Sequence, residues 1–194
     1  ISGYSFVSKV NSNGTEEWFT YFYDIPLNTI ALTVDKDDDI YVLNKRAKTD
    51  SLSPSAFQQK GDTSSNISYQ DVISKLDSNG NHIWSTFYSK NDSKINAIMA
   101  ADKGLYIYGM HLATSSGSNY FGTSGSFLEA TSKKTNATSS VFLSKFNFNG
   151  ERLWSTYFAN EKSYVPYPSN NISKNPSNLT VIGDDVYFMT LHNN

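Results

Sequence analysis

The sequence predicts an all-β protein built from repeated antiparallel hairpins, and three observations lead to this fold class. First, no segment of helical length carries apolar residues at the spacings of an amphipathic helix. Second, the chain holds 13 Tyr and 12 Phe, and aromatic residues favour strands. Third, one sequence motif occurs in three similar copies: SKVNSNGTEEWFTYF at 8–22, SKLDSNGNHIWSTFY at 74–88 and SKFNFNGERLWSTYF at 144–158. Because repetition indicates a repeated structural unit, the three stretches are expected to fold alike.

The first element of each repeat is expected to be a β-hairpin centred on an Asn-Gly pair. A short β-prone run ends in Asn or Asp, and a Gly three residues later suits a turn that closes in the left-handed region. A Trp follows each Gly by four residues, which gives the series Gly14 and Trp18, Gly80 and Trp84, Gly150 and Trp154. These six residues are predicted to be structural, with the glycines in turns and the tryptophans packed between neighbouring units. A glycan site lined by the three Trp rings is the alternative, and it would require the rings to be exposed.

A second hairpin is expected in each repeat. TVDKDDDIYVLN at 33–44, MAADKGLYIYG at 99–109 and TVIGDDVYFMT at 180–190 each combine two β-prone runs with a tight turn. Two hairpins per repeat would make a four-stranded antiparallel sheet, and repeated sheets of this kind are typical of a β-propeller. We therefore predict about three four-stranded antiparallel blades that form a partial ring of a larger propeller. A repeating sandwich is the rival, but it requires about seven strands per unit.

The chain is predicted to be a single propeller segment, 1–194, with approximate repeats at 1–70, 71–140 and 141–194 that start and end inside units. Closed propellers need about four to eight blades, so the partners expected first are other blades of the same longer polypeptide. Association of several chains into one ring is the alternative.

Polar loops make each repeat longer than the roughly 40–50 residues of most propeller blades. They are expected at 48–70, 113–140 and 159–178. Phe57 and Phe127, 70 residues apart, mark matching points in the first two loops and form a weaker third landmark of the repeat. Loops on a rigid scaffold are where binding residues concentrate.

The composition excludes several classes of function. The net charge is −2 and no Lys/Arg cluster occurs, so neither nucleic acid nor an anionic membrane surface is expected as a partner. No apolar run approaches the length of a membrane span, so no direct membrane insertion is expected. The absence of Cys excludes disulfides, thiolate metal sites and a Cys nucleophile.

No set of catalytic or cofactor-binding residues is recognised. The histidines, His82, His111 and His192, lack metal-ligand spacing and are expected at the surface or at blade edges. The acidic run at 35–39 is interpreted as a hairpin turn, with a calcium site on Asp35, Asp37 and Asp39 as the alternative. The repeated Lys9, Lys75 and Lys145 are expected along strand surfaces, with their stems packed and their ammonium groups in water.

The order SFVSKVNSNG, WFTYF, VDKDDDIYV and SAFQ resembles the bacterial SBBP repeats, which are named for a β-propeller. The likeness covers nearly the whole chain as three imperfect repeats, and Trp-Ser-Thr at 84–86 and 154–156 carries it most clearly. The long loops, and the lack of a Gly pair after the Trp strand, depart from that pattern. The resemblance implies an exported or cell-surface protein of the Bacteroidota, as cargo of type IX secretion, and no shared catalytic residues.

We therefore expect a non-enzymatic β-propeller segment of a secreted or surface-exposed bacterial protein that acts in adhesion, ligand binding or protein assembly. Surface glycans and proteins of the secretion machinery are the partners that this interpretation suggests. A carbohydrate-active enzyme, either a glycosidase or a lyase, is the alternative. It would need two carboxylates facing each other across a cleft, for which Asp35, Glu129 and Glu161 are the candidates.

Overall fold

The computed structural model describes residues 5–22, 31–52, 54–64, 66–90, 93–112, 119–130, 139–158 and 179–189. Its regular structure consists of twelve β-strands. This part of the chain contains no helix long and apolar enough to cross a membrane. The prediction of an all-β fold is confirmed.

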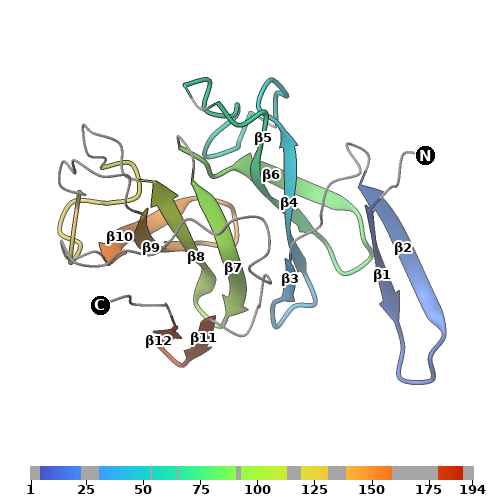
Figure 1. Ribbon diagram of the computed structural model, residues 1–194. Helices are drawn as coiled ribbons and strands as arrows, with labels where there is room; N and C mark the ends of the chain where they lie inside the picture. Colours follow the sequence, from blue (N-terminus) through green and yellow to red (C-terminus); the bar gives the residue numbers. More distant parts are fainter. Residues whose placement is uncertain are drawn as a thin grey trace.

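The strands form two four-stranded antiparallel sheets and two separate hairpins (Figure 1). The first sheet contains β3 (Ala31–Val34), β4 (Ile40–Ala47), β5 (Tyr69–Leu76) and β6 (His82–Phe87). The second sheet contains β7 (Lys94–Ala101), β8 (Gly104–Leu112), β9 (Ser139–Phe146) and β10 (Arg152–Phe158). The N-terminal hairpin consists of β1 (Ser5–Val10) and β2 (Glu16–Phe22), and the C-terminal hairpin of β11 (Leu179–Ile182) and β12 (Asp185–Phe188).

The sheets do not follow the sequence repeats as expected. The first sheet takes β3 and β4 from the first repeat but β5 and β6 from the second, and the second sheet is composed in the same way. The expectation that both hairpins of one repeat share a sheet is therefore wrong. β4 and β5 pair along their whole length, from Ile40 opposite Leu76 to Ala47 opposite Tyr69, although a long loop separates them. The described strands accordingly give two whole sheets with a hairpin at either end, and they close no ring.

The sheets and hairpins stack face to face in chain order. The leading strands β3, β7 and β11 lie beside one another, with β7 in contact with both others. Three apolar layers separate the stacked parts. Their members include Val7 and Leu76 in the first layer, Leu43 and Phe142 in the second, and Leu143 and Leu179 in the third.

β4 shows how a sheet inside the stack is buried on both faces. Alternate side chains of a strand point to opposite sides. Ile40 and Val42 accordingly pack toward the N-terminal hairpin, whereas Tyr41 and Leu43 pack toward the second sheet. All four are buried, which explains why this strand is apolar throughout rather than alternating.

The three Asn-Gly turns share one geometry, as predicted. At their first positions, the Oδ1 atoms of Asn11, Asp77 and Asn147 each accept two backbone N–H groups at 2.8–3.0 Å. The glycines have φ values of +79°, +81° and +86°, in the left-handed region that favours Gly. A β-bulge lies immediately before each Trp and helps to set the direction of its side chain.

The loops marked by Phe57 and Phe127 cover the outer strands of the two sheets. The N–H of Gln58 donates to Thr86 Oγ1 at 2.9 Å, and its carbonyl accepts the N–H of Phe87 at 3.0 Å. Leu128 repeats both bonds with Thr156 and Tyr157, at 2.9 and 3.0 Å. Because unpaired edge strands invite uncontrolled pairing, the third landmark of the repeat acts as an edge cover.

Candidate functional site

Two of the three repeated Trp side chains donate a hydrogen bond to a turn of the following unit. Trp18 on β2 donates its indole N–H to the carbonyl of Ser78 at 3.0 Å, in the turn between β5 and β6. Trp84 on β6 donates in the same way to Phe148 at 3.1 Å, in the turn between β9 and β10. Ser78 and Phe148 occupy the second position of their turns. The sequence repeat thus encodes a contact between units as well as a fold within each unit.

The turn glycines lie against the same indole rings. A Cβ added at Gly80 would come within 2.7 Å of the Trp18 ring, and one at Gly150 within 3.3 Å of the Trp84 ring. At Gly14 the same construction meets nothing within 4 Å. The two docked turns therefore need Gly both for their left-handed backbone and for the space that a side chain would take.

Two of the repeated lysines cover Tyr rings on the neighbouring strand. Lys75 Nζ lies 5.4 Å from the centre of the Tyr41 ring, and Lys145 Nζ lies 5.1 Å from that of Tyr106, within cation–π range. Lys75 also pairs with Asp39 at 2.7 Å, and its side chain is only 12% exposed. The expectation that the Lys head lies in water is therefore wrong for Lys75, because a carboxylate and a ring replace the solvent.

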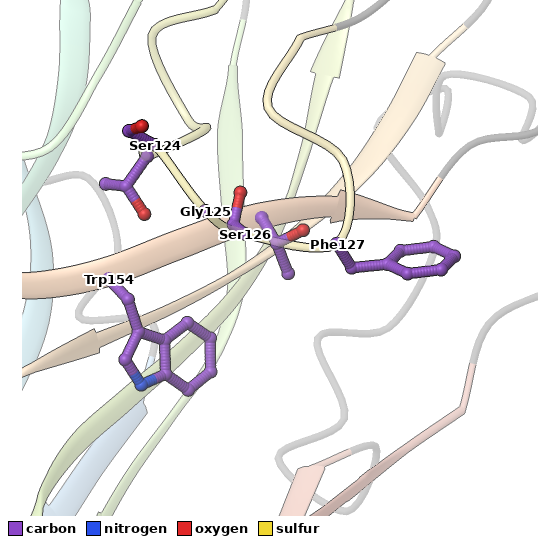
Figure 2. A pocket seen from close by; sticks show the side chains of 7 residues that line it. Ser124, Gly125, Ser126, Phe127 and Trp154 are labelled. Carbon is purple, nitrogen blue, oxygen red and sulfur yellow. The ribbon is translucent and has the colours of Figure 1, made fainter.

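Trp154 lies on β10, at the margin of the apolar layer between the second sheet and the C-terminal hairpin. No described residue accepts a hydrogen bond from its indole N–H, and its half-buried ring packs beside Tyr106. Together with Thr156 and loop residues 123–127, it lines a hollow of about 350 Å3. Figure 2 shows the loop residues Ser124 to Phe127 across β10 from the indole ring.

The matching place at the preceding interface is occupied. There, Arg152 from the following unit lies over the Phe57 ring, 4.9 Å from its centre. Phe127, the counterpart of Phe57, is 81% exposed. The hollow at Trp154 and Phe127 is therefore the equivalent of a surface that another unit covers elsewhere in the chain.

Buried hydroxyl groups, which were not predicted from the sequence, link the two whole sheets. Ser144 and Ser155 are hydrogen-bonded through their Oγ atoms, and the Tyr88 hydroxyl reaches Ser144 Oγ at 2.6 Å from the first sheet. Ser74 and Ser85 form the same pair at 2.8 Å. The available signal was a Ser before each repeated Lys and after two of the Trp residues.

The hydroxyl pairs act in packing rather than as nucleophiles. His82 Nε2 lies 2.7 Å from Ser85 Oγ, a distance suited to general-base activation. However, Ser85 is only 3% exposed, so a substrate has no access to it.

The acidic run forms the turn that the sequence predicts. Asp35 Oδ1 accepts the backbone N–H groups of Asp37 and Asp39 at 2.9 and 3.0 Å, and Oδ2 accepts the Tyr41 hydroxyl at 3.0 Å. Burial, followed by this hydrogen bond, raises the pKa of Tyr41 above its ordinary value, so the phenol remains a donor. Asp37 pairs with Lys36, and Asp39 with Lys75. The carboxylates of the calcium alternative are thus engaged with separate partners.

The remaining candidates are not brought together into a site. Glu129 Oε1 accepts the N–H of Gly125 within its own loop at 2.6 Å, and Asp35 belongs to the turn described above. Glu161 and His192 lie outside the described residues. Among the described residues, no group of three or more His, Cys, Asp or Glu is arranged to hold a metal ion.

His111 lies in the interior of the protein. It is fully buried beside Phe121 and Tyr157, and neither ring nitrogen has a hydrogen-bond partner among the residues that the structure describes. The expectation of a surface or blade-edge position is therefore wrong for this residue. Burial, helped by the charge of Lys90, lowers its pKa to about 4.

Comparison of the chain with known protein families and with curated proteins finds no match. The resemblance to SBBP repeats, and the bacterial origin that it implies, therefore stay predictions from the sequence.

Proposed function

We propose that the chain is a non-enzymatic, propeller-like segment that acts in binding and assembly within a secreted or surface-exposed bacterial protein. The stacking of four-stranded sheets through their faces, with leading strands side by side, supports a propeller-like arrangement. The secreted location and type IX export rest on the resemblance to SBBP repeats alone.

The observation that carries this proposal is the apolar surface at the two ends of the stack. Large apolar side chains between 46% and 67% exposed lie on the two terminal hairpins or directly after them: Phe6, Val10, Phe19 and Tyr21 at one end, and Ile182, Tyr187 and Met189 at the other. Exposed apolar patches of this kind mark interaction surfaces. The repeated residues of the interior are meanwhile engaged in scaffold contacts.

Isothermal titration tests the proposal. The purified chain would be titrated with a panel of bacterial surface polysaccharides and with itself, alongside a Phe6→Ser/Phe19→Ser variant and a Phe127→Ser variant. Binding that the end-face or loop substitutions weaken, without turnover, is the expected result. Turnover of a polysaccharide that a single Asp or Glu replacement abolishes would overturn the proposal and favour the carbohydrate-active enzyme.

A further inference from the structure

We propose that the face of the second sheet that carries Trp154 (the Trp154 face) binds the N-terminal hairpin of a second copy of the chain, head to tail. This inference rests on the assembly role proposed above and names the partner.

The two ends carry complementary halves of one contact. Trp18 and Trp84 each bind the turn of a following unit, whereas Trp154 has an unpaired indole N–H among the described residues. The turn at 11–14 carries the other half of this contact, an acceptor without a Trp. No described residue donates to the Ser12 carbonyl, and the space beside Gly14 is open.

The exposed face of the N-terminal hairpin matches a face that is buried elsewhere in the chain. In the repeat alignment, Phe6, Val10 and Tyr21 correspond to Phe142, Phe146 and Tyr157 of β9 and β10. The first three are 58%, 55% and 46% exposed, but their counterparts are 1% exposed or less, against the first sheet. The same hairpin face is thus fully covered when a sheet precedes it.

The terminal hairpins are also complementary in their strand pairing. In both whole sheets, the second strand of one hairpin pairs with the first strand of the next, so that Tyr41 is opposite Lys75 and Tyr106 is opposite Lys145. The same register would place β12 of one copy against β1 of the other, with Tyr187 opposite Lys9. Tyr187 is 54% exposed, and the Lys9 side chain is 41% exposed. Docking would therefore create a third Lys–Tyr pair of the kind seen twice within the chain.

Such pairing would complete every sheet. Each copy would contribute its two whole sheets, and the joined hairpins would add one more at each junction. Two copies would then supply six four-stranded sheets, within the usual range of about four to eight for closed propellers. A head-to-tail contact that closes gives a ring, and one that does not gives open oligomers.

Disulfide trapping tests the pairing, because the chain contains no Cys of its own. Lys9→Cys and Tyr187→Cys variants would be mixed and oxidised, and a disulfide between them is expected, since opposed strand positions lie within disulfide reach. Thr180→Cys on β11 is the matched control. It lies one strand further away and is expected to remain unlinked to Lys9→Cys. Preferential linkage of Lys9→Cys to itself would overturn the head-to-tail arrangement.

Sedimentation of unmodified chains provides a second readout. Concentration-dependent association is expected, and Lys9→Met should weaken it roughly fivefold through loss of the Lys–Tyr contact. Lys60→Met, at an exposed loop position, should leave it unchanged. A chain that stays monomeric and untrapped at all concentrations overturns the proposal. Binding of a synthetic 5–22 hairpin without self-association would assign the face to a repeat of another polypeptide. Neither result would decide the titration with polysaccharides, so the proposed function would still be tested separately.

Discussion

Two of the three interfaces in the stack share the Trp-to-turn contact but differ in how well they are packed. Between the N-terminal hairpin and the first sheet, the buried apolar cluster of the described residues has four members, Val7, Ile40, Val42 and Leu76, and a hollow of about 240 Å3 remains beside Trp18. Between the two whole sheets, 14 buried residues pack together, and Phe121 stacks on Phe142 with 3.9 Å between ring centres.

The difference separates what the repeat encodes from what the loops add. Trp18 and Trp84 are placed by the same bulge, the same register and the same turn. Phe121, by contrast, comes from the loop after β8, and the matching residue of the first repeat is Ser51. The repeated sequence motif therefore positions the units, whereas residues outside the motif determine how much apolar surface each interface buries.

The largest effect is expected from Phe121→Ala, which removes the loop residue at the centre of the well-packed interface. The cavity and the lost burial should lower the free energy of unfolding by about 3–5 kcal/mol. Leu76→Ala in the thinner interface should cost about 2 kcal/mol, because the neighbouring hollow gives the site room to relax. Urea unfolding of both variants checks the order, and equal losses would show that the loop does not strengthen the interface.

The well-packed interface should also make stability depend on pH through His111. Its pKa is about 4 in the folded chain and 6.5 in its ordinary state. Between these values the unfolded chain binds a proton that the folded chain does not, so stability falls as the pH is lowered from 6.5 toward 4. The loss should approach about 3 kcal/mol over this range.

Urea unfolding at several pH values measures this slope. His111→Phe fills the same aromatic site without a titrating group and should remove most of the slope. His82→Gln is the comparison: burial lowers the pKa of His82 as well, but less strongly than that of His111, so this variant should retain most of the slope. An unchanged slope in His111→Phe would show that other groups cause it.

The sequence predicted the local elements because a turn needs only a few adjacent residues. Gly80 and Gly150 indicate a turn that closes in the left-handed region, and the alternation of side chains after each Trp indicates a strand. The pairing of β4 with β5 could not be deduced, because a period states how often hairpins recur and not which two share hydrogen bonds.

The residues that contact the repeated Trp side chains and His111 could not be predicted for a similar reason. The sequence placed Trp18, Trp84 and Trp154 between units, and the structure bears this out for the first two. That the Trp84 indole reaches Phe148, 64 residues away, depends on the stacking of whole sheets. The burial of His111 also required the loop that brings Phe121 over it.

A matched pair of substitutions isolates the docking contact itself. Gly80→Ala and Gly14→Ala both place a side chain on a left-handed backbone, which should cost about 1 kcal/mol each. Gly80→Ala must in addition displace the Trp18 ring, and this should add about 1–2 kcal/mol. Urea unfolding at a dilution where the chain is monomeric gives both values. Equal losses would mean that the Trp18 interface does not stabilise the monomer.

The smallest effect concerns Asp38, which borders the hollow of the thinner interface. Asp38 has φ +62°, whereas the second and third repeats have Gly104 and Gly183 in the corresponding turns, with φ +146° and +61°. Asp38→Gly should therefore stabilise the chain by about 0.5–1 kcal/mol, because Gly adopts left-handed backbone without steric conflict. Its carboxylate is 71% exposed and 4.0 Å from Lys9, so the loss of that ion pair should matter little. Asp37→Gly, at a position with ordinary φ, should instead destabilise the turn. Thermal unfolding of the two variants would contradict this explanation if both moved the midpoint in the same direction.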